Sequence, residues 1–271
     1  MTWEKGDVLL LLRACHLPPT LAVTAIATAL AASVGAPALD VALAVLVGQL
    51  SVGWANDWLD AERDLAVGRR DKPVVQGLAP GVVRAAALLA LAACVPLSLR
   101  LGALAGALHL VAVASAWAYD LRLKATVWSW APFAVSFGLM PSVVTATLPG
   151  QPLAPLWGTA AGALLGIGAH GANVLPDLAD DAATGVRGLP QRLGRTGAVA
   201  LTGIALVLAT AALATGAGVR LGLPALLLAA LVFGAGLAVG RRPRSRAPFV
   251  AVLVVAALDV GLLLSQGTAL A

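Results

Sequence analysis

Charge is scarce in this chain. Only 11% of its 271 residues are charged, against about 25% in an average soluble protein, and the mean hydropathy is +0.92. So few charges exclude an ordinary water-soluble domain and favour a protein that crosses a membrane several times. No segment is polar enough to form a second domain, so we expect residues 1–271 to form one membrane domain.

Cysteine is almost absent as well. Cys15 and Cys94 stand alone in apolar surroundings, which excludes a disulfide framework and a cysteine-ligated metal site. The N-terminus also lacks the basic region of a cleavable signal peptide, because Glu4 and Asp7 interrupt it. We expect residues 1–16 to form an interfacial segment instead.

Long apolar runs are what the chain has in abundance. A membrane helix needs about 20 mostly apolar residues, and cutting the runs at charges, Pro and Gly predicts nine such helices. A Pro-Gly turn at 148–152 divides the uncharged stretch 125–176 into two of them. The expected fold is an all-α integral membrane protein. Its nine spans are expected at 17–35, 38–57, 82–99, 102–119, 128–148, 154–173, 198–217, 221–240 and 247–267.

Basic residues are distributed unevenly over the loops that these spans create. Nine spans place all of the 18 Lys and Arg residues on one side except Arg100 and Arg220. Because cytoplasmic loops carry the excess of Lys and Arg, we expect a cytoplasmic N-terminus and an external C-terminus in the cell membrane. The basic net charge of +5 then reflects orientation, and no nucleic-acid partner is expected.

Acidic residues gather where the second span ends. Asp57, Asp60, Glu62 and Asp64 lie within eight residues. Carboxylates this close repel one another and resist burial. They are compatible with a membrane protein if a divalent cation, or a ligand that brings one, neutralises them.

This acidic stretch recurs 117 residues later. Both copies read N-x3-D-x3-D-x3-G-x-R-x2-P, and residues four apart share one face of a helix. We interpret the copies as an internal repeat. They predict two pseudo-repeated four-helix halves plus one further helix around a central cavity open to the cytoplasm. The two predicted polar rows are Asn56, Asp60 and Asp64, and Asn173, Asp177 and Asp181.

Basic residues follow the acidic helices on the same side. Mg²⁺ is usually held by one or two carboxylates together with phosphate oxygens. Acids and bases at the mouth of an apolar cavity therefore predict an amphiphilic ligand with a diphosphate head and a hydrocarbon tail. Breaking its allylic C–O bond would leave a carbocation for aromatic faces to stabilise. The basic residues are Arg69, Arg70, Lys72, Arg122, Lys124, Arg187 and Arg192, and the aromatic candidates are Trp54, Trp58, Tyr119 and Trp128.

These motifs resemble those of the UbiA superfamily of intramembrane prenyltransferases. The family's first motif, NDxxDxxxD, is matched by Asn56, Asp57, Asp60 and Asp64, and its second, DxxxD, by Asp177 and Asp181. The segment 119–124 is similar to the family's tyrosine-to-lysine loop, and 13–20 resembles its usual start. The resemblance covers about the whole chain, and the nine expected spans agree with the family's all-α fold.

The resemblance implies Mg²⁺-dependent transfer of a prenyl group from an allylic prenyl diphosphate to an aromatic or other hydrophobic lipid acceptor in the membrane, with release of pyrophosphate. It implies that Mg²⁺ is bound by Asp57, Asp60, Asp64, Asp177 and Asp181. The substrate would be bound by Asn56, Arg70, Lys72, Tyr119, Lys124, Asn173 and Arg187. Val75, Asp120 and Arg187 depart from the usual residues, and the acceptor and the chain length stay open.

Three other functions remain to be compared. A terpene cyclase of the same fold would use the same donor without a second substrate, and the sequence does not separate it from a transferase. A lipid or ion transporter with two repeats should carry ionisable groups near the membrane midplane, whereas here they crowd one face and only a few, such as His109 and Asp259, lie deeper. A CDP-alcohol phosphotransferase needs an Asp-Gly pair, which this chain lacks.

Overall fold

Helices dominate the computed structural model of this chain. The structure describes residues 5–176, 178, 181, 185–217, 219–240 and 247–270, and no strand occurs among them. The all-α class expected from the apolar runs is therefore confirmed. The helices are α1 (Lys5–Ala14), α2 (Leu17–Ser33), α3 (Ala38–Leu59), α4 (Ala61–Val67), α5 (Pro80–Leu99), α6 (Ala103–Leu121), the 3-10 turn η1 (Leu123–Ala125), α7 (Ala131–Thr145), α8 (Leu156–Val174), α10 (Leu189–Ala217), α11 (Val219–Gly240), α12 (Ala247–Ser265) and α13 (Gly267–Leu270).

Each of the nine expected spans overlaps one of these helices. Six of the described helices are long and apolar enough to cross a membrane: α3, α5, α6, α10, α11 and α12. Helices α1 and α2, bent by 58° at their junction, pass the same test only as a pair, and α7 has 15 residues. A multi-pass membrane protein is thus confirmed, while the count of nine spans stays a prediction.

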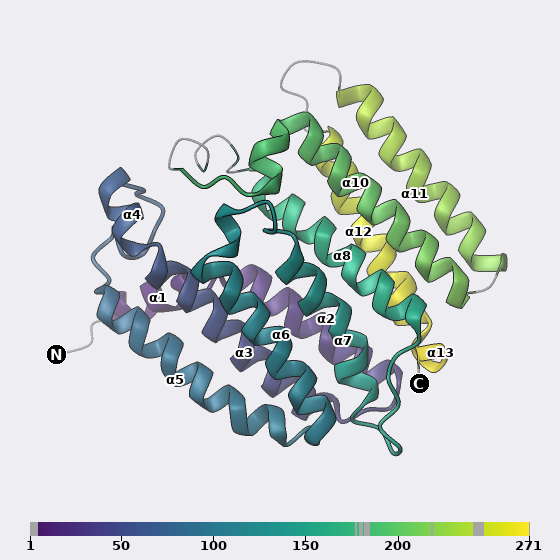
Figure 1. The fold of residues 1–271 in the computed structure, drawn as a ribbon, viewed down its shortest axis with the longest axis horizontal. Coiled ribbons are helices and arrows are strands. Elements are labelled where there is room, and N and C mark those ends of the chain that lie inside the picture. The colour runs from purple at the N-terminus through teal and green to yellow at the C-terminus, as the bar shows by residue number, and fades with distance from the viewer. Residues whose placement is uncertain are drawn as a thin grey trace.

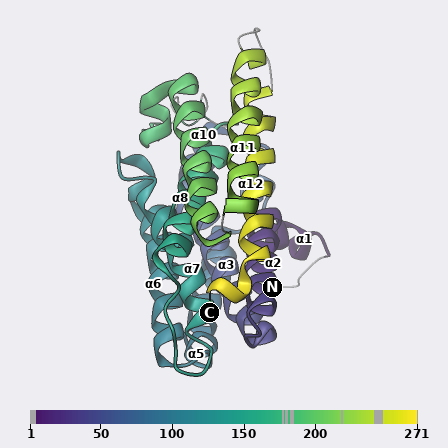
Figure 2. The ribbon, with the colours of Figure 1, turned by 90° about the vertical axis from the view of Figure 1, so that its right-hand side faces the viewer.

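The helices lie side by side as one bundle, seen from two directions in Figures 1 and 2. Packed pairs close a ring in the order α2, α3, α6, α7, α8 and α12, which returns to α2. Helix α5 packs on α3, and α11 packs on α10 and α12. Figure 1 shows α4 at the upper-left end of the bundle and α13 at the lower-right end, so the first acidic stretch and the C-terminus lie at opposite ends.

An ion pair marks the end opposite to the first acidic stretch. Arg100 donates to Asp40 Oδ1 at 3.1 Å. Asp40 lies at the start of α3 and Asp57 near its end, which at 1.5 Å per residue is a separation of about 25 Å. Arg100 is therefore distant from the acidic stretch, as the uneven distribution of basic residues predicted.

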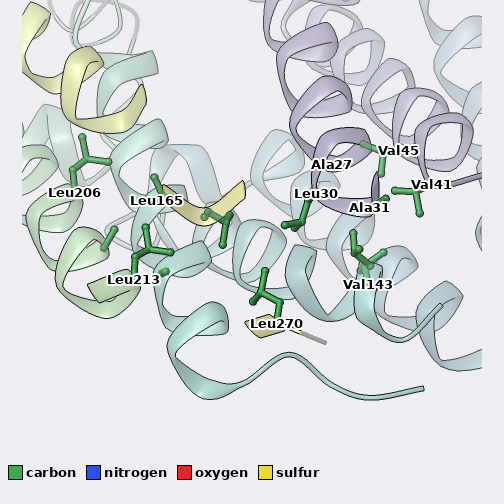
Figure 3. Close-up of a cluster of buried hydrophobic side chains, with 14 of the residues drawn as sticks. Ala27, Leu30, Ala31, Val41, Val45, Val143, Leu165, Leu206, Leu213 and Leu270 are labelled. Atoms are coloured by element: carbon green, nitrogen blue, oxygen red, sulfur yellow. The ribbon is translucent and has the colours of Figure 1, made fainter. Parts of the chain in front are cut away.

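A cluster of buried apolar side chains joins the early and late helices (Figure 3). Leu30 of α2 and Val143 of α7 belong to it, together with Leu165 of α8, Leu206 of α10 and Leu270 of α13. In lipid, helices associate through close packing and not through exclusion of water. Interlocking side chains of this kind therefore hold the two sides of the bundle together.

Glycines of α8 allow α7 to approach closely. A Cβ atom added to Gly162 would overlap the carbonyl oxygen of Phe137, and one added to Gly166 would overlap that of Phe133. The obstructing atoms belong to the backbone and cannot rotate away. This contact fixes Phe133 against α8, where it contributes to the candidate site.

We expect Gly162→Ala to destabilise the bundle by about 1–3 kcal/mol, the usual cost of overpacking a close contact. The matched control is Gly234→Ala in α11, where an added Cβ meets nothing within 4 Å. The control should be neutral or slightly stabilising, since Ala favours a helix over Gly. Thermal unfolding of both variants in the same detergent measures the difference, and an equal midpoint for both would contradict the close α7–α8 contact.

Candidate active site

The expected row of Asn56, Asp60 and Asp64 does not lie on one uninterrupted helix. Helix α3 ends at Leu59 and α4 begins at Ala61, with Asp60 between them. Asp60 nevertheless keeps a near-helical backbone (φ −90°, ψ −4°), and its amide donates to Asn56 O at 3.0 Å. The Asp64 amide donates in turn to Asp60 O at 2.9 Å, so the i, i+4 hydrogen bonds continue across the boundary between α3 and α4.

Asp57 is a buried carboxylate with two side-chain partners on one oxygen. Its side chain is buried near the end of α3, and Lys72 Nζ donates to Oδ1 at 2.7 Å. His16 Nε2 lies 3.0 Å from the same oxygen. The second oxygen, Oδ2, has no hydrogen-bond partner among the described residues. Asp57 thus keeps one free buried oxygen while two basic side chains contact the other.

The corner between α1 and α2 brings His16 to this position. His16 adopts the left-handed backbone conformation (φ 53°) at the start of α2. Gly53 of α3 permits the approach, because an added Cβ would overlap the carbonyl oxygen of Cys15. Trp54 further fixes the corner by donating its indole N–H to Leu11 O at 2.8 Å. The N-terminal segment is therefore built into the site.

Asp60 is paired with two cations from different parts of the chain. Lys124, in the η1 turn after α6, donates to Oδ1 at 2.5 Å. Arg63 donates to Oδ2 at 3.0 Å. Because Lys124 is 64 residues away in sequence, this ion pair joins the tyrosine-to-lysine loop to the first acidic stretch.

Asp64 is fully buried and lacks hydrogen-bond partners for both side-chain oxygens among the described residues. Its nearest cations are Arg63 NH2 at 3.7 Å and Lys72 Nζ at 4.0 Å. Burial raises the pKa of Asp64 above its usual value and outweighs the opposite effects of Lys72 and Arg63. The Lys72 ammonium thus lies between the carboxylates of Asp57 and Asp64.

Asn56 faces a carboxylate on α6. Its amide donates to Asp120 Oδ1 at 2.8 Å, and Asp120 is buried with Oδ2 unpartnered among the described residues. Neither Asp120 nor His16 was expected from the sequence to belong to the site. The only sequence signal for Asp120 was its departure from the family pattern.

Aromatic rings border the carboxylates. Tyr119 meets Phe133 edge-on with ring centroids 5.1 Å apart and His170 at 5.7 Å. Phe133 and His170 lie 4.9 Å apart. The Tyr119 hydroxyl interacts electrostatically with Asp60, Asp120 and Asp181, which come from both acidic segments and from α6.

The second acidic segment is described in part. Helix α8 ends at Val174, and Asp177 lies outside the described residues. Asn173, near that end, is exposed. Asp181 Oδ2 accepts a hydrogen bond from Gln191 at 3.0 Å. Asn173 and Asp181 therefore do not both belong to α8, and the expected row through Asp177 stays a prediction.

The basic residues expected to bind substrate differ in their surroundings. Lys72 and Lys124 contact the acidic stretch directly. Arg70 and Arg187 are exposed, and their backbone oxygens accept hydrogen bonds from Gln76 and Arg192. The structure thus brings the two lysines to the carboxylates and leaves the two arginines at the surface.

A divalent cation fits the donors present, although no three Asp, Glu, His or Cys side chains gather as a metal site in the part of the chain that the structure describes. Free buried oxygens remain on Asp57, Asp64 and Asp120. Hard cations prefer such carboxylate oxygens. A cationic group, the Lys72 ammonium, already lies between Asp57 and Asp64. The charge and the donor atoms suit Mg²⁺.

Comparison with known sequences decides the family. The model of the UbiA prenyltransferase family matches residues 17–266. The chain belongs to the UbiA prenyltransferase family. This confirms the resemblance carried by the two aspartate motifs. No curated protein matches the chain by sequence.

Solved UbiA structures share the fold. A UbiA homologue from Archaeoglobus fulgidus bound to GPP and Mg²⁺ has a TM-score of 0.67 at 15% identity, over 95% of this chain and 99% of that one. A digeranylgeranylglyceryl phosphate synthase has a TM-score of 0.68 at 14% identity, over 97% and 99%. An apo UbiA homologue from Aeropyrum pernix K1 has a TM-score of 0.62 at 20% identity, over 90% and 96%. At such low sequence identity, the structural similarity shows only that this chain shares the fold of these proteins.

Removing the buried charge of Asp64 should stabilise the UbiA fold at neutral pH. An ordinary Asp titrates near 3.8, and the folded protein holds its Asp64 proton to higher pH. The free energy of unfolding therefore falls as the pH rises from 3.8 to the raised pKa of folded Asp64. Over this range the folded protein still holds the proton, whereas the unfolded chain has already lost it. We expect Asp64→Asn to raise the unfolding temperature at pH 7 without Mg²⁺, with a gain that shrinks toward pH 4.

The control is Asp71→Asn, which removes the same charge from a side chain that is 65% exposed. It should show no such pH-dependent gain. Thermal unfolding in detergent across this pH range measures both variants. If the unfolding temperatures of Asp64→Asn and the wild type differed by the same amount at every pH, the burial of an ionisable Asp64 would be contradicted.

Proposed function

We propose that the protein transfers a prenyl group from an allylic prenyl diphosphate to an aromatic or lipid acceptor within the membrane, with Mg²⁺, and releases pyrophosphate. The observation that carries this proposal is the placement of Lys72 between Asp57 and Asp64, with Lys124 on Asp60. Such a site combines carboxylates, which bind a divalent cation, with ammonium groups, which bind phosphate oxygens. Membership of the UbiA prenyltransferase family supports the same reaction.

The donor's head group fits the charged end of the bundle. Bound Mg²⁺ would supply positive charge that neutralises the departing pyrophosphate. We infer that it is held by Asp57, Asp60, Asp64, Asp177 and Asp181. The phosphate oxygens would be bound by Arg70, Lys72, Lys124 and Arg187, with Asn56 and Asn173 shaping the site.

The two lysines have a second task in this proposal. Without a donor, Lys72 and Lys124 compensate carboxylates that would otherwise be buried and unpaired, which is costly in a low-dielectric site. When the diphosphate binds, each ammonium exchanges a carboxylate oxygen for a phosphate oxygen. The site thus stays close to neutral in both states, and the same residues serve stability and binding.

Tyr119 and Phe133 define the apolar side of the proposed site. Their rings pack edge-to-face, 5.1 Å apart between centroids. Aromatic faces stabilise a cation that is shielded from water, so they suit the allylic cation left when the C–O bond breaks. Tyr119 is the better placed of the two, because its hydroxyl end lies near Asp60 and Asp181.

The orientation in the membrane forms part of the proposal. All Lys and Arg residues except Arg100 and Arg220 belong to one side of the expected topology. By the positive-inside rule that side faces the cytoplasm. The donor would then enter from the cytoplasm and the acceptor from the bilayer.

Pyrophosphate release by the purified protein tests this function. We would supply geranyl, farnesyl and geranylgeranyl diphosphates with Mg²⁺, with and without a bacterial lipid extract as the acceptor source. We expect release that needs both Mg²⁺ and the extract, and a prenylated product in mass spectra. Asp60→Asn should lower the rate at least a hundredfold, because it removes a proposed carboxylate ligand of Mg²⁺.

Asp71→Asn is the matched control and should keep near wild-type rates, since its side chain is exposed and forms a surface ion pair with Arg69. Release that needs no acceptor would indicate a cyclase of the same fold. No release from folded protein with any of these donors or with a longer polyprenyl diphosphate would contradict the proposal.

A further inference from the structure

Ser129 connects three segments that border the proposed site. The Leu189 backbone amide, at the start of α10, donates to Ser129 Oγ at 2.9 Å. His170 Nε2, on α8, lies 3.0 Å from the same oxygen. The neighbouring Gly188 is close to both Ser129 and the Lys124 loop, because a Cβ there would lie 2.9 Å from Ser129 Oγ and 2.7 Å from Lys124 O.

Hydrogen-bond pairing at Ser129 assigns a tautomer to His170. A backbone amide can only donate, so Ser129 Oγ accepts from Leu189. The Ser129 hydroxyl hydrogen has one acceptor within reach among the described residues, His170 Nε2. An imidazole nitrogen that accepts leaves the proton of the neutral ring on the other nitrogen. The assignment that pairs the Ser129 hydroxyl therefore places the His170 N–H at Nδ1.

That N–H is buried and has no partner among the described residues. His170 is 2% exposed, and Nδ1 makes no hydrogen bond there. The nearest rings are those of Phe133 and Tyr119, and an aromatic face accepts an N–H only weakly. Buried donors are nearly always paired, so an unpaired one calls for an explanation.

We propose that His170 is a specificity-determining residue that donates its Nδ1 hydrogen to an oxygen of the second substrate. This rests on the proposed prenyl transfer. A neutral donor suits a carbonyl, hydroxyl, carboxylate or phosphate oxygen beside the reacting atom of the acceptor. The diphosphate of the donor already has the Lys72 and Lys124 ammonium groups, which contact Asp57 and Asp60. The inference thus favours an oxygen-bearing acceptor, and a transferase over a cyclase.

Two substitutions of His170 distinguish the roles of its two ring nitrogens. In His170→Gln, the amide reaches the Nε2 position, keeps a contact for Ser129 and leaves no donor at Nδ1. In His170→Asn, the amide nitrogen takes the Nδ1 position and keeps the donor. The substrates are the allylic diphosphate that the wild type turns over, with Mg²⁺, and graded amounts of lipid extract as the acceptor source.

We expect His170→Gln to raise the half-saturating amount of extract about tenfold, as for one lost hydrogen bond, with the KM for the donor unchanged. His170→Asn should stay within about threefold of the wild type. An unchanged extract requirement in His170→Gln, or equal increases for donor and extract, would overturn the proposal.

If neither variant turns over, calorimetric binding of the donor with Mg²⁺ decides. Retained donor binding supports a role on the acceptor side, and lost binding shows that His170 is only structural and overturns the proposal. Failure of the proposed function looks different, because the wild type itself would then release no pyrophosphate from any donor.

Discussion

The placement of one ammonium group between two buried carboxylates governs the charged end of this protein. Asp57 and Asp64 are almost fully buried, and Lys72 Nζ lies 2.7 Å and 4.0 Å from their oxygens. Unpaired charges in such surroundings would be strongly destabilising. The loop that carries Lys72 therefore has to fold back onto the end of α3, and His16 contacts the Asp57 carboxylate from the α1–α2 corner.

Other parts of the bundle serve the same end of the molecule. Lys124 ties the turn after α6 to Asp60, and Ser129, five residues later, ties that turn to α8 and to α10. The close α7–α8 contact positions Phe133 against His170. The carboxylates, the aromatic rings and the start of α10 thus belong to one connected network, although they come from both sides of the ring of helices.

Deeper polar residues make hydrogen bonds within the bundle. His109 Nδ1 lies 2.8 Å from Ser98 Oγ, and Asp259 accepts a hydrogen bond from Thr210 at 2.6 Å. Pairing of this kind is what intramembrane polar groups require. Asp64 of the candidate site differs, because both of its oxygens lack partners among the described residues, whereas Asp259 keeps one oxygen paired.

Patterns within the sequence predicted the all-α class, the family and the positions of the acidic segments, because hydropathy and motif spacing are local properties. They did not predict the helix break at Asp60, since the i, i+4 spacing takes a continuous helix for granted. They also did not place His16 or Asp120 in the site. Those two contacts join residues 41 and 64 positions apart, and only the packing of α2 and α6 against α3 brings them together.

The number of spans could not be settled from apolar runs alone. Helix α2 has 17 residues and α7 has 15, lengths between a spanning helix and a buried one. The internal repeat stays a prediction for a related reason. Its second copy includes Asp177, outside the described residues, and α8 ends before the carboxylates that would complete the row.

The exchange of lysine contacts for a metal-bound diphosphate is the central claim, and calorimetry with an unreactive donor tests it most directly. Geranyl S-thiolodiphosphate would be titrated into the detergent-solubilised protein with Mg²⁺ and again with EDTA. The account predicts saturable binding that needs Mg²⁺ and weakens at least tenfold in Lys72→Met, which removes a phosphate ligand. Equal affinity with Mg²⁺ and with EDTA would contradict it, because the buried carboxylates would then have no part in holding the donor.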